Sequence, residues 1–455
     1  MPATAALAHD ELEALRGRLT GTLARPGEPG YELATPWNVA VPMAPRAVVA
    51  AATATDVQEA VRFANEHGLR VAVQATGHGA VAFEGDDVLL VHTRGLDELA
   101  VDPETRIARI GAGLDQQAVM DAAAPHGLAP LVGSSPAVGV VGYVTGGGTG
   151  PLARTFGLTC ERVVAFEVVT GDGEALRATR EDHPEVFGAL CGGKHALGIV
   201  TALEMELVEL ADLHGGALYF DGADAAEVLH LWRRWAEDLP EHTTTSLAFL
   251  QLSDLPGVPP PLAGRLTVAV RVASVADDET CLALLAPLRA VAEPIVDVVG
   301  RMEHGAIAMI HADPTDPMPS YDDTATLTAL PAEAADAVLA AAGPGSGSPQ
   351  IVVELRHLGG AISRSTAPAD AFGHRDAAYG LLTVGVPVPP VAELVHSHAR
   401  DLVEALAPWS TGLRMPNFGA GSGREAYDDG TRAWLRALAE RHDPAGVLRV
   451  GVAAR

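Results

Sequence analysis

A dense run of glycines is the first feature of this chain that could do chemistry. Between Gly133 and Gly150 the sequence reads GSSPAVGVVGYVTGGGTG, with seven glycines in 18 residues, where the overall frequency of 48 in 455 predicts about two. Because side chains do not block them, backbone N–H groups in such a loop can approach an anion or a flat ring. The alternative is a merely flexible loop. Four valines interleave with the glycines and indicate a buried segment, so we favour a binding loop.

A second pattern is a strand that carries charge. In IVVELRHLGG, residues 351–360, strand alternation places Glu354 and Arg356 on one face and Val353 and Leu355 on the other. A carboxylate held in this way can take a proton from a substrate or anchor it. The alternative is a solvated edge-strand carboxylate that pairs with Arg356.

Several common chemistries lack their residue patterns. No G-x-x-x-x-G-K-[ST] run indicates a P-loop, and no G-x-G-x-x-G follows a first strand and opens a helix. The 17 histidines include no H-E-x-x-H motif and no Cys/His cluster at zinc spacing, so we expect no metal site. The G-x-S-x-G elbow of α/β-hydrolases is also missing from the sequence.

Five segments together resemble one known family. They are PWNV…GHGA (36–80), GSSPAVG…ALRAT (133–179), GGKHALGIVTALEMEL (192–207), VVELRHLGGAISR with AFGHRDAAY (352–379) and the C-terminal NF…HDP (417–444). In order and content they are similar to the vanillyl-alcohol-oxidase/PCMH superfamily and, within it, to the berberine-bridge-enzyme-like group. The resemblance covers nearly the whole chain. It implies an α+β fold, with a PCMH-type FAD-binding domain of two α+β subdomains and a substrate domain whose antiparallel sheet is covered by helices.

The resemblance also implies how FAD is held. In the family the first loop wraps the FAD pyrophosphate and ends in a Gly-His pair, here Gly77-His78, whose imidazole is commonly bonded to the flavin 8α-methyl group. The second loop often supplies a cysteine for another flavin bond, and Ser135 stands at that position, so we expect one covalent link, through His78. The residues implied to contact FAD are Gln74, Ala75, Thr76, Gly77, His78, Gly79, Gly133, Ser134, Ser135, Val138, Gly139, Gly142, Tyr143, Gly146, Gly148, Ile199, Val200 and Asn417.

Three departures from the family pattern bear on function. Gln74 replaces an arginine near the pyrophosphate, so backbone N–H groups must bind more of the anion. Ala196 replaces an asparagine. Met415 replaces a tyrosine that serves as a base in some sugar- and alcohol-oxidising relatives, which argues against sugar oxidation by that route.

The implied reaction is oxidation of an organic molecule by hydride transfer to flavin N5, with O₂ as the second substrate. In relatives the glutamate of the charged strand points at the flavin, so Glu354 is the first candidate for a base or substrate anchor. Tyr143 is the second candidate, as a hydrogen-bond donor or proton relay, with simple packing as the alternative. Val138 matches the small apolar position that admits oxygen in the family. Further candidates to line the substrate cavity are Phe249, Gln251, His304, His311 and Tyr379.

A rival interpretation belongs to a different class. The replacements at Gln74, Ala196 and Met415 also suit a flavin-binding protein of this fold with a non-redox cyclase or binding role. The apolar, proline-rich second domain indicates a medium-sized organic substrate, such as a secondary metabolite, an alkaloid-like amine or a polyketide.

The elements that must position these residues follow from periodicity. TDVQEAVRFANEHG (55–68) has the apolar spacing of a helix, LRVAVQ after it reads as a buried strand, and Thr-Gly-Asp-Gly (170–173) as a hairpin turn. We expect an N-terminal helix and lead-in over 1–31, the FAD-binding domain over 32–210, the substrate domain over 211–405, and a C-terminal segment over 406–455. The last segment is too short to bury its own core and should return to the FAD domain.

Composition narrows the partners. The chain has 58 acidic against 31 basic side chains, a net charge of -27, and no basic run to bind nucleic acid or anionic lipid. Only three scattered cysteines occur, and the N-terminal sequence does not read as a signal peptide. We therefore expect a cytoplasmic monomer or homodimer with a small-molecule substrate and no membrane or nucleic-acid partner.

Overall fold

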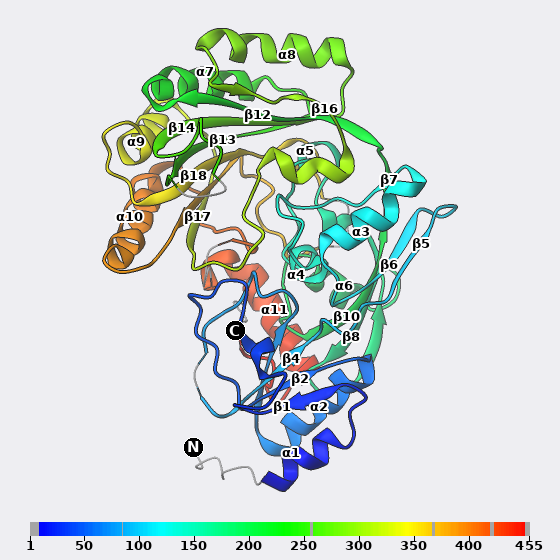
Figure 1. Cartoon of the computed structure of the whole chain (residues 1–455). Helices are drawn as coiled ribbons and strands as arrows, with labels where there is room; N and C mark the ends of the chain where they lie inside the picture. Colours follow the sequence, from blue (N-terminus) through cyan, green and yellow to red (C-terminus); the bar gives the residue numbers. More distant parts are fainter. Residues whose placement is uncertain (1–8, 84, 255–257, 366–368, 419–422, 451–455) are drawn as a thin grey trace.

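The first region of the fold is a four-stranded sheet covered by helices. The computed structural model describes residues 9–83, 85–254, 258–365, 369–418 and 423–450 (Figure 1). The strands run in the order β1 (Thr22–Ala24), β2 (Ala47–Ala50), β4 (Val88–His92) and β3 (Arg70–Gln74), accompanied by α1 (His9–Arg16), η1 (Tyr31–Ala34) and α2 (Ala54–His67). Both β2 and β3 are parallel to β4. A Thr53–Asp56 capping box begins α2, and Gly68 in the left-handed conformation ends the helix that was predicted over 55–68.

A five-stranded antiparallel sheet forms the second region. Its order is β5 (Leu99–Asp102), β6 (Ile107–Gly111), β10 (Gly198–Glu206), β8 (Val163–Thr170) and β9 (Ala175–Ala178). The helices here are α3 (Gln116–Ala123), α4 (Val140–Val144), α5 (Ala153–Phe156) and α6 (Pro184–Leu190), and β7 (Leu128–Ala129) pairs with β11 (Val208–Glu209). Val169 and Ile199 of this sheet share a core with α2, so α2 is packed against both sheets.

The third region is an eight-stranded antiparallel sheet. Its strands are β15 (Val296–Asp297), β12 (Asp212–Asp221), β14 (Arg265–Ser274), β13 (Thr243–Leu252), β18 (Gln350–His357), β19 (Tyr379–Gly385) and β17 (Tyr321–Leu327), with β16 (Gly300–Glu303) beside β12. The outer face carries α7 (Ala225–Glu237), α8 (Asp278–Val291), α9 (Ala332–Ala342) and α10 (Ala392–Ala405) (Figure 1). Trp232 of α7 is fully buried in the core between helices and sheet. The predicted α+β fold class is confirmed.

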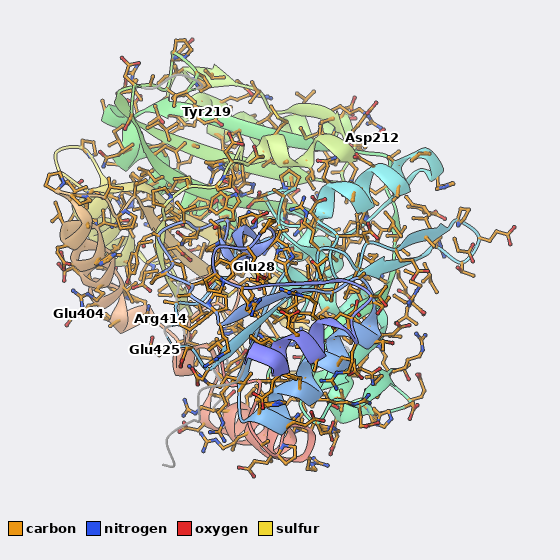
Figure 2. The ribbon with its side chains drawn as sticks, turned by 60° about the horizontal axis from the view of Figure 1, so that its bottom comes forward. Glu28, Asp212, Tyr219, Glu404, Arg414 and Glu425 are labelled. Carbon is orange, nitrogen blue, oxygen red and sulfur yellow. The ribbon has the colours of Figure 1, made fainter. Side chains whose placement is uncertain are left out.

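The C-terminal part of the chain reaches back to the first two regions, since Val447 and Leu448 lie in the core around α2. Leu435 and Leu438 of α11 (Asp429–His442) lie in the same core as Phe187 of α6. Arg414 pairs with both Glu425 and Asp323, and so joins this part to β17; Figure 2 shows Arg414 and Glu425 close together. The division at residues 210 and 405 remains a proposal.

One segment of the expected substrate domain also lies in the core of the FAD-binding region. Leu358, Ile362 and Phe372 pack in the cluster that contains the side chains of α4 and α6. The chain therefore crosses between the regions immediately after β18, which brings the end of that strand to the glycine-rich segment 133–150.

Candidate cofactor and substrate site

The loop that follows β3 is fixed by close packing. Gly77 has φ +83°, and a Cβ atom there would lie 2.6 Å from the backbone nitrogen of Trp37. Only glycine tolerates both the conformation and the approach. The imidazole of His78 stacks on the indole of Trp37, with ring centroids 4.6 Å apart and planes inclined by 17°. The Trp37 indole N–H donates in turn to the carbonyl of Thr315 at 3.0 Å.

The imidazole of His78 is neutral and has one unused nitrogen. Its Nδ1 lies 2.9 Å from Thr76 Oγ1, whereas Nε2 is buried and has no hydrogen-bond partner in the part of the chain that the structure describes. Burial lowers the pKa of His78 to about 4, so the ring is uncharged near pH 7. With the proton on Nδ1, Nε2 keeps a lone pair that can form a bond to an electrophilic carbon.

The backbone of the same loop offers hydrogen-bond donors. Among the described residues, no acceptor is found for the amides of residues 76–79. Successive unused N–H groups are the donors that bind an anion such as a pyrophosphate. Gln74 adds no charge here, since it is buried and its Nε2 donates to the carbonyl of Leu33 at 2.9 Å.

The glycine-rich segment 133–150 is held against this loop. The amide of Gly139 donates to Thr76 Oγ1 at 3.2 Å, and the amide of Gly133 donates to Gln116 Oε1 at 2.7 Å. These two predicted FAD contacts therefore use their amides within the protein. The Ser135 hydroxyl is buried without a partner in the described structure, and its position leaves the prediction of a single flavin link untested.

Part of the glycine density in this segment has a packing cause. A Cβ atom on Gly146 would lie 1.9 Å from Asn417 Oδ1, one on Gly147 2.5 Å from the ring of Phe372, and one on Gly148 2.7 Å from Thr159 Cβ. Gly147 and Gly148 also have φ of +96° and +79°. These glycines let core side chains approach the loop, in addition to any ligand.

Lys194 belongs to this site, and the sequence reasoning missed it. It is the only lysine of the chain. Its Nζ donates to the carbonyl of Gly142 at 3.0 Å and to Asn417 Oδ1, and Asn417 Nδ2 donates to the carbonyl of Tyr143 at 2.9 Å. Burial lowers the pKa of Lys194 to about 8. A single lysine directly after the Gly192-Gly193 pair was the signal that could have identified it.

Two predicted FAD contacts lie in cores instead. Ile199 packs in the core around α2, and Val200 packs in the core around α4 and α6. Both residues also belong to the ladder between β10 and β8. Their side chains are therefore used to join elements, and a role in binding FAD stays a prediction.

The charged strand carries a buried ion cluster. Glu354 Oε1 accepts hydrogen bonds from Arg271 Nη1 and from Ser246 Oγ, both at 2.7 Å, and lies 3.3 Å from His311 Nε2, while Oε2 accepts from Arg356 Nε at 2.8 Å. Glu354 is 1% exposed on a central strand, so the solvated edge-strand interpretation is wrong, although the pairing with Arg356 is real. Burial raises the pKa of Glu354, but Arg356 and Arg271 outweigh it and hold that pKa well below its usual range.

A cavity separates the ion cluster from the FAD-binding region. Thr149 and Gly150 of the glycine-rich segment form one side of it. Ser246, Arg271, His311 and Arg356 form the other side. Glu354 is not among the described residues that line the cavity, so it lies behind the two arginines. The wall that faces a ligand is cationic.

Tyr143 lies behind the wall of the same cavity. A Cβ atom on Gly150 would lie 2.7 Å from Tyr143 Oη, so the hydroxyl lies directly behind a wall residue. The hydroxyl is buried and has no hydrogen-bond partner in the described part of the chain. Burial raises the pKa of Tyr143, so it is a protonated donor at neutral pH. Tyr143 is therefore packed inside the protein, and its predicted role as a donor or proton relay stays a prediction.

Whether each remaining candidate lines the cavity depends on which face of the sheet, or which loop, carries its side chain. His311 lines the cavity, as expected. Phe249 and Tyr379 do not, because their strands turn both side chains into the core beneath the outer helices. Gln251 and His304 are also absent from the described cavity wall. Strand phase could not be read from the sequence, because both faces of this sheet are covered.

A metal-binding cluster and a membrane-spanning helix are both absent from the described residues. No group of three or more His, Cys, Asp or Glu side chains could hold a metal ion. No helix in the described ranges is long and apolar enough to cross a membrane.

Comparison with known proteins agrees with this geometry. Residues 45–179 match the family model for an FAD binding domain. (R)-6-Hydroxynicotine oxidase of Paenarthrobacter nicotinovorans is 29% identical over 194 residues, which make up 42% of this chain and 42% of that protein. The match thus spans about two-fifths of that curated relative's length.

Solved structures match over the whole fold. Wild-type BBE-like 1 of Physcomitrella patens superposes with a TM-score of 0.84 over 98% of this chain and 99% of that chain, at 19% sequence identity. Glucooligosaccharide oxidase of Acremonium strictum, whose FAD is 6-S-cysteinyl and 8α-N1-histidyl, gives a TM-score of 0.83 over 97% of this chain and 99% of that chain, also at 19% identity.

The fold and the matched domain define an FAD-binding flavoprotein. The predicted resemblance to the vanillyl-alcohol-oxidase/PCMH superfamily, berberine-bridge-enzyme-like group, is confirmed for the FAD binding domain over residues 45–179 and for the fold.

Proposed function

We propose that this chain is an FAD-dependent oxidase of a medium-sized organic substrate. One observation carries the proposal. The glycine-rich segment 133–150 touches the His78 loop through the Gly139–Thr76 hydrogen bond, and it also forms a wall of the cavity that holds Arg271 and Arg356. A cofactor held by the two loops is thus a neighbour of that cavity. The relative named (R)-6-hydroxynicotine oxidase supports the reaction class.

The residues present fit FAD. His78 Nε2 is a buried nitrogen without a partner in the described chain, and the amides of residues 76–79 are unused donors. The glycines at 77, 147 and 148 adopt left-handed conformations that shape the two loops. We propose that the loop amides hold the pyrophosphate, that His78 carries the covalent bond to the flavin, and that Ser135 forms no second bond.

The chemistry that FAD supplies when bound is acceptance of a hydride, with O₂ as the final electron acceptor. The chain must then position the substrate and control protons. Glu354 is held anionic by two guanidinium groups and is a weak base, so we assign it a positioning role toward Arg271 and Arg356. Tyr143 keeps its proton and supplies a hydrogen-bond donor, at Oη, beside the cavity.

The location, oligomeric state and substrate of the enzyme follow from the same interpretation. We propose a cytoplasmic monomer or homodimer that acts on a small molecule such as a secondary metabolite. Polar side chains that can hydrogen-bond to one group of an organic molecule line the cavity, among them Ser246, Arg271 and His311. This lining supports a small-molecule substrate.

The test is the behaviour of the protein's flavin in air. We expect protein purified from cells supplied with riboflavin to be yellow and, after anaerobic photoreduction, to reoxidise rapidly when air is admitted. A yellow protein whose reduced flavin persists in air would support the non-redox cyclase or binding role instead. A protein that stays colourless with excess FAD would contradict the proposal.

A further inference from the structure

We propose that the cavity beside Arg271 and Arg356 binds a planar organic oxyanion, such as the carboxylate or ionised phenol of the substrate. The inference rests on the proposed function and names the substrate class of that same site. It favours acidic aromatic or polyketide-like substrates over alkaloid-like amines.

The two arginines are placed by strand register. Ser246 of β13 lies directly opposite Arg271 of β14 on one side and Arg356 of β18 on the other. All three line the cavity, on the sheet face away from the outer helices. Since they stand on three adjacent central strands, their backbone positions are fixed before any ligand binds.

The charges around the cavity favour an anion. At the wall itself the guanidinium groups of Arg271 and Arg356 face one carboxylate, that of Glu354, while Asp313 is more distant and the charge of the buried Arg154 is balanced by Glu241. Arg154 donates to the carbonyls of Thr243, Leu239 and Leu358, and no carboxylate bonds to it among the described residues. The two arginines against Glu354 leave the wall with about one positive charge, inside a chain whose net charge is -27.

The nearby histidines do not change this balance. Burial, followed by the charge of Arg271, lowers the pKa of His311. Burial and Arg154 lower the pKa of His357 to about 3. Both rings are uncharged at neutral pH, where His311 serves as a neutral hydrogen-bonding group of the wall.

Arg356 and Arg271 have N–H groups that no protein acceptor uses in the described part of the chain, so these groups can bind a ligand. Arg356 uses Nε on Glu354, and its two terminal amino groups have no hydrogen-bond acceptor in the described part of the chain. Arg271 Nε is buried and also lacks a partner there. A planar guanidinium with a free edge matches a carboxylate in a two-bond geometry.

The geometry of this ion cluster fits less well with the alternative role, in which Glu354 binds an amine substrate as a base or anchor. If Glu354 were a base for an amine, one of its oxygens should face the cavity, yet Oε1 and Oε2 both accept hydrogen bonds from the arginines. A protonated amine would also face two guanidinium groups at the wall. The arrangement repels cations and attracts oxyanions.

The experiment measures binding by calorimetry on the FAD-loaded protein at neutral pH. The probes are benzoate and 1-naphthoate, each compared with its neutral amide, benzamide or 1-naphthamide. We expect at least one acid to bind about tenfold or more tightly than its amide. Arg356→Gln should weaken acid binding by roughly 10–100-fold and leave amide binding nearly unchanged.

Glu354→Gln gives the sharpest contrast, because it removes a negative charge at constant volume. We expect it to tighten acid binding, whereas a role as amine anchor predicts no gain. Arg301→Gln is the matched control, since Arg301 lies in an exposed ion pair with Asp212 and should leave acid binding unchanged. If Arg356→Gln fails to fold, Arg356→Lys keeps the charge, loses the planar fork, and should weaken acid binding severalfold.

Two results would overturn the proposal: acids and amides that bind equally or not at all, or a Glu354→Gln variant that loses acid binding. The flavin spectrum recorded before each titration separates this failure from that of the proposed function. Yellow protein without acid preference contradicts only the oxyanion site, whereas colourless protein contradicts the FAD assignment.

Discussion

His78 stacks on Trp37, with ring centroids 4.6 Å apart, and its buried Nε2 is the ring nitrogen that has no hydrogen-bond partner among the described residues. The stacked indole excludes water from the ring, whose pKa burial lowers to about 4. Trp37, 41 residues earlier in the sequence, thus helps to keep the imidazole neutral, as the proposed covalent bond to the flavin requires.

Replacing Trp37 should reduce the covalent attachment of FAD to His78. We expect Trp37→Leu to lower the fraction of chains that carry covalent FAD, because the imidazole gains water and rotational freedom, while noncovalent FAD binding persists. The measurement is the intact mass of denatured protein beside the flavin content of the native protein. Trp409→Leu, which changes a half-buried tryptophan of the third region, is the control and should keep full covalent loading.

Gly77 should be irreplaceable where other glycines are not. Gly77→Ala places a methyl group 2.6 Å from the backbone of Trp37 at φ +83°, so the loop must move and flavin binding should be lost. Gly345→Ala is matched in conformation, with φ +77°, but has open space around it. Both variants should lose roughly 1 kcal/mol of stability, because alanine is strained in the left-handed conformation. Only Gly77→Ala should be colourless. Equal flavin content in the two variants would contradict the loop assignment.

Lys194 offers a chemical test, since no other lysine competes for reagent. Because burial lowers its pKa to about 8, the unprotonated amine is present at lower pH than in an ordinary lysine. We expect acetic anhydride to label Lys194 with a midpoint near pH 8 in flavin-free protein and much more slowly in FAD-loaded protein. Peptide mass spectrometry measures the label. Identical labelling with and without FAD would remove Lys194 from the cofactor site.

Buried neutral histidines should make the protein sensitive to acid. The pKa of His304 is lowered by burial to about 4, against about 6.5 in an unfolded chain, so the unfolded state binds more protons between these values. The free energy of unfolding should therefore fall as pH drops from about 6.5 to about 4, by about 1.4 kcal/mol per pH unit for each such histidine.

Urea unfolding at several pH values measures this slope. His304→Gln should reduce the slope by one such increment, whereas His126→Gln, at an exposed position, should leave it unchanged. Equal slopes in the wild type and His304→Gln would show that His304 does not contribute.

Local patterns in the sequence predicted much of the fold. The helical spacing over 55–68 and the Thr-Gly-Asp-Gly turn correspond to α2 and to the hairpin between β8 and β9. Two strands of the large sheet, β17 and β19, were not predicted. The first begins with three polar residues, Tyr321, Asp322 and Asp323, and its pairing partner lies more than 50 residues away, so local alternation gave no signal.

The candidate site also contains residues that the sequence could locate and residues that it could not. Gly77-His78 and Glu354 could be located from sequence because each lies in a motif or a clear alternation. Arg271 and Lys194 could not, because they reach the site from β14 and from the turn before β10, and only tertiary folding brings them to Glu354 and Asn417. The cationic wall is a product of strand register, which the sequence alone does not specify.

The intact mass of the denatured protein tests the central claim, that His78 carries FAD, most directly. Wild type from riboflavin-supplied cells should exceed the polypeptide mass by one FAD, and His78→Ala should have the bare mass of its own polypeptide although the native variant is yellow. A wild type at the bare polypeptide mass, or a His78→Ala variant that still carries the added mass of FAD, would contradict the claim.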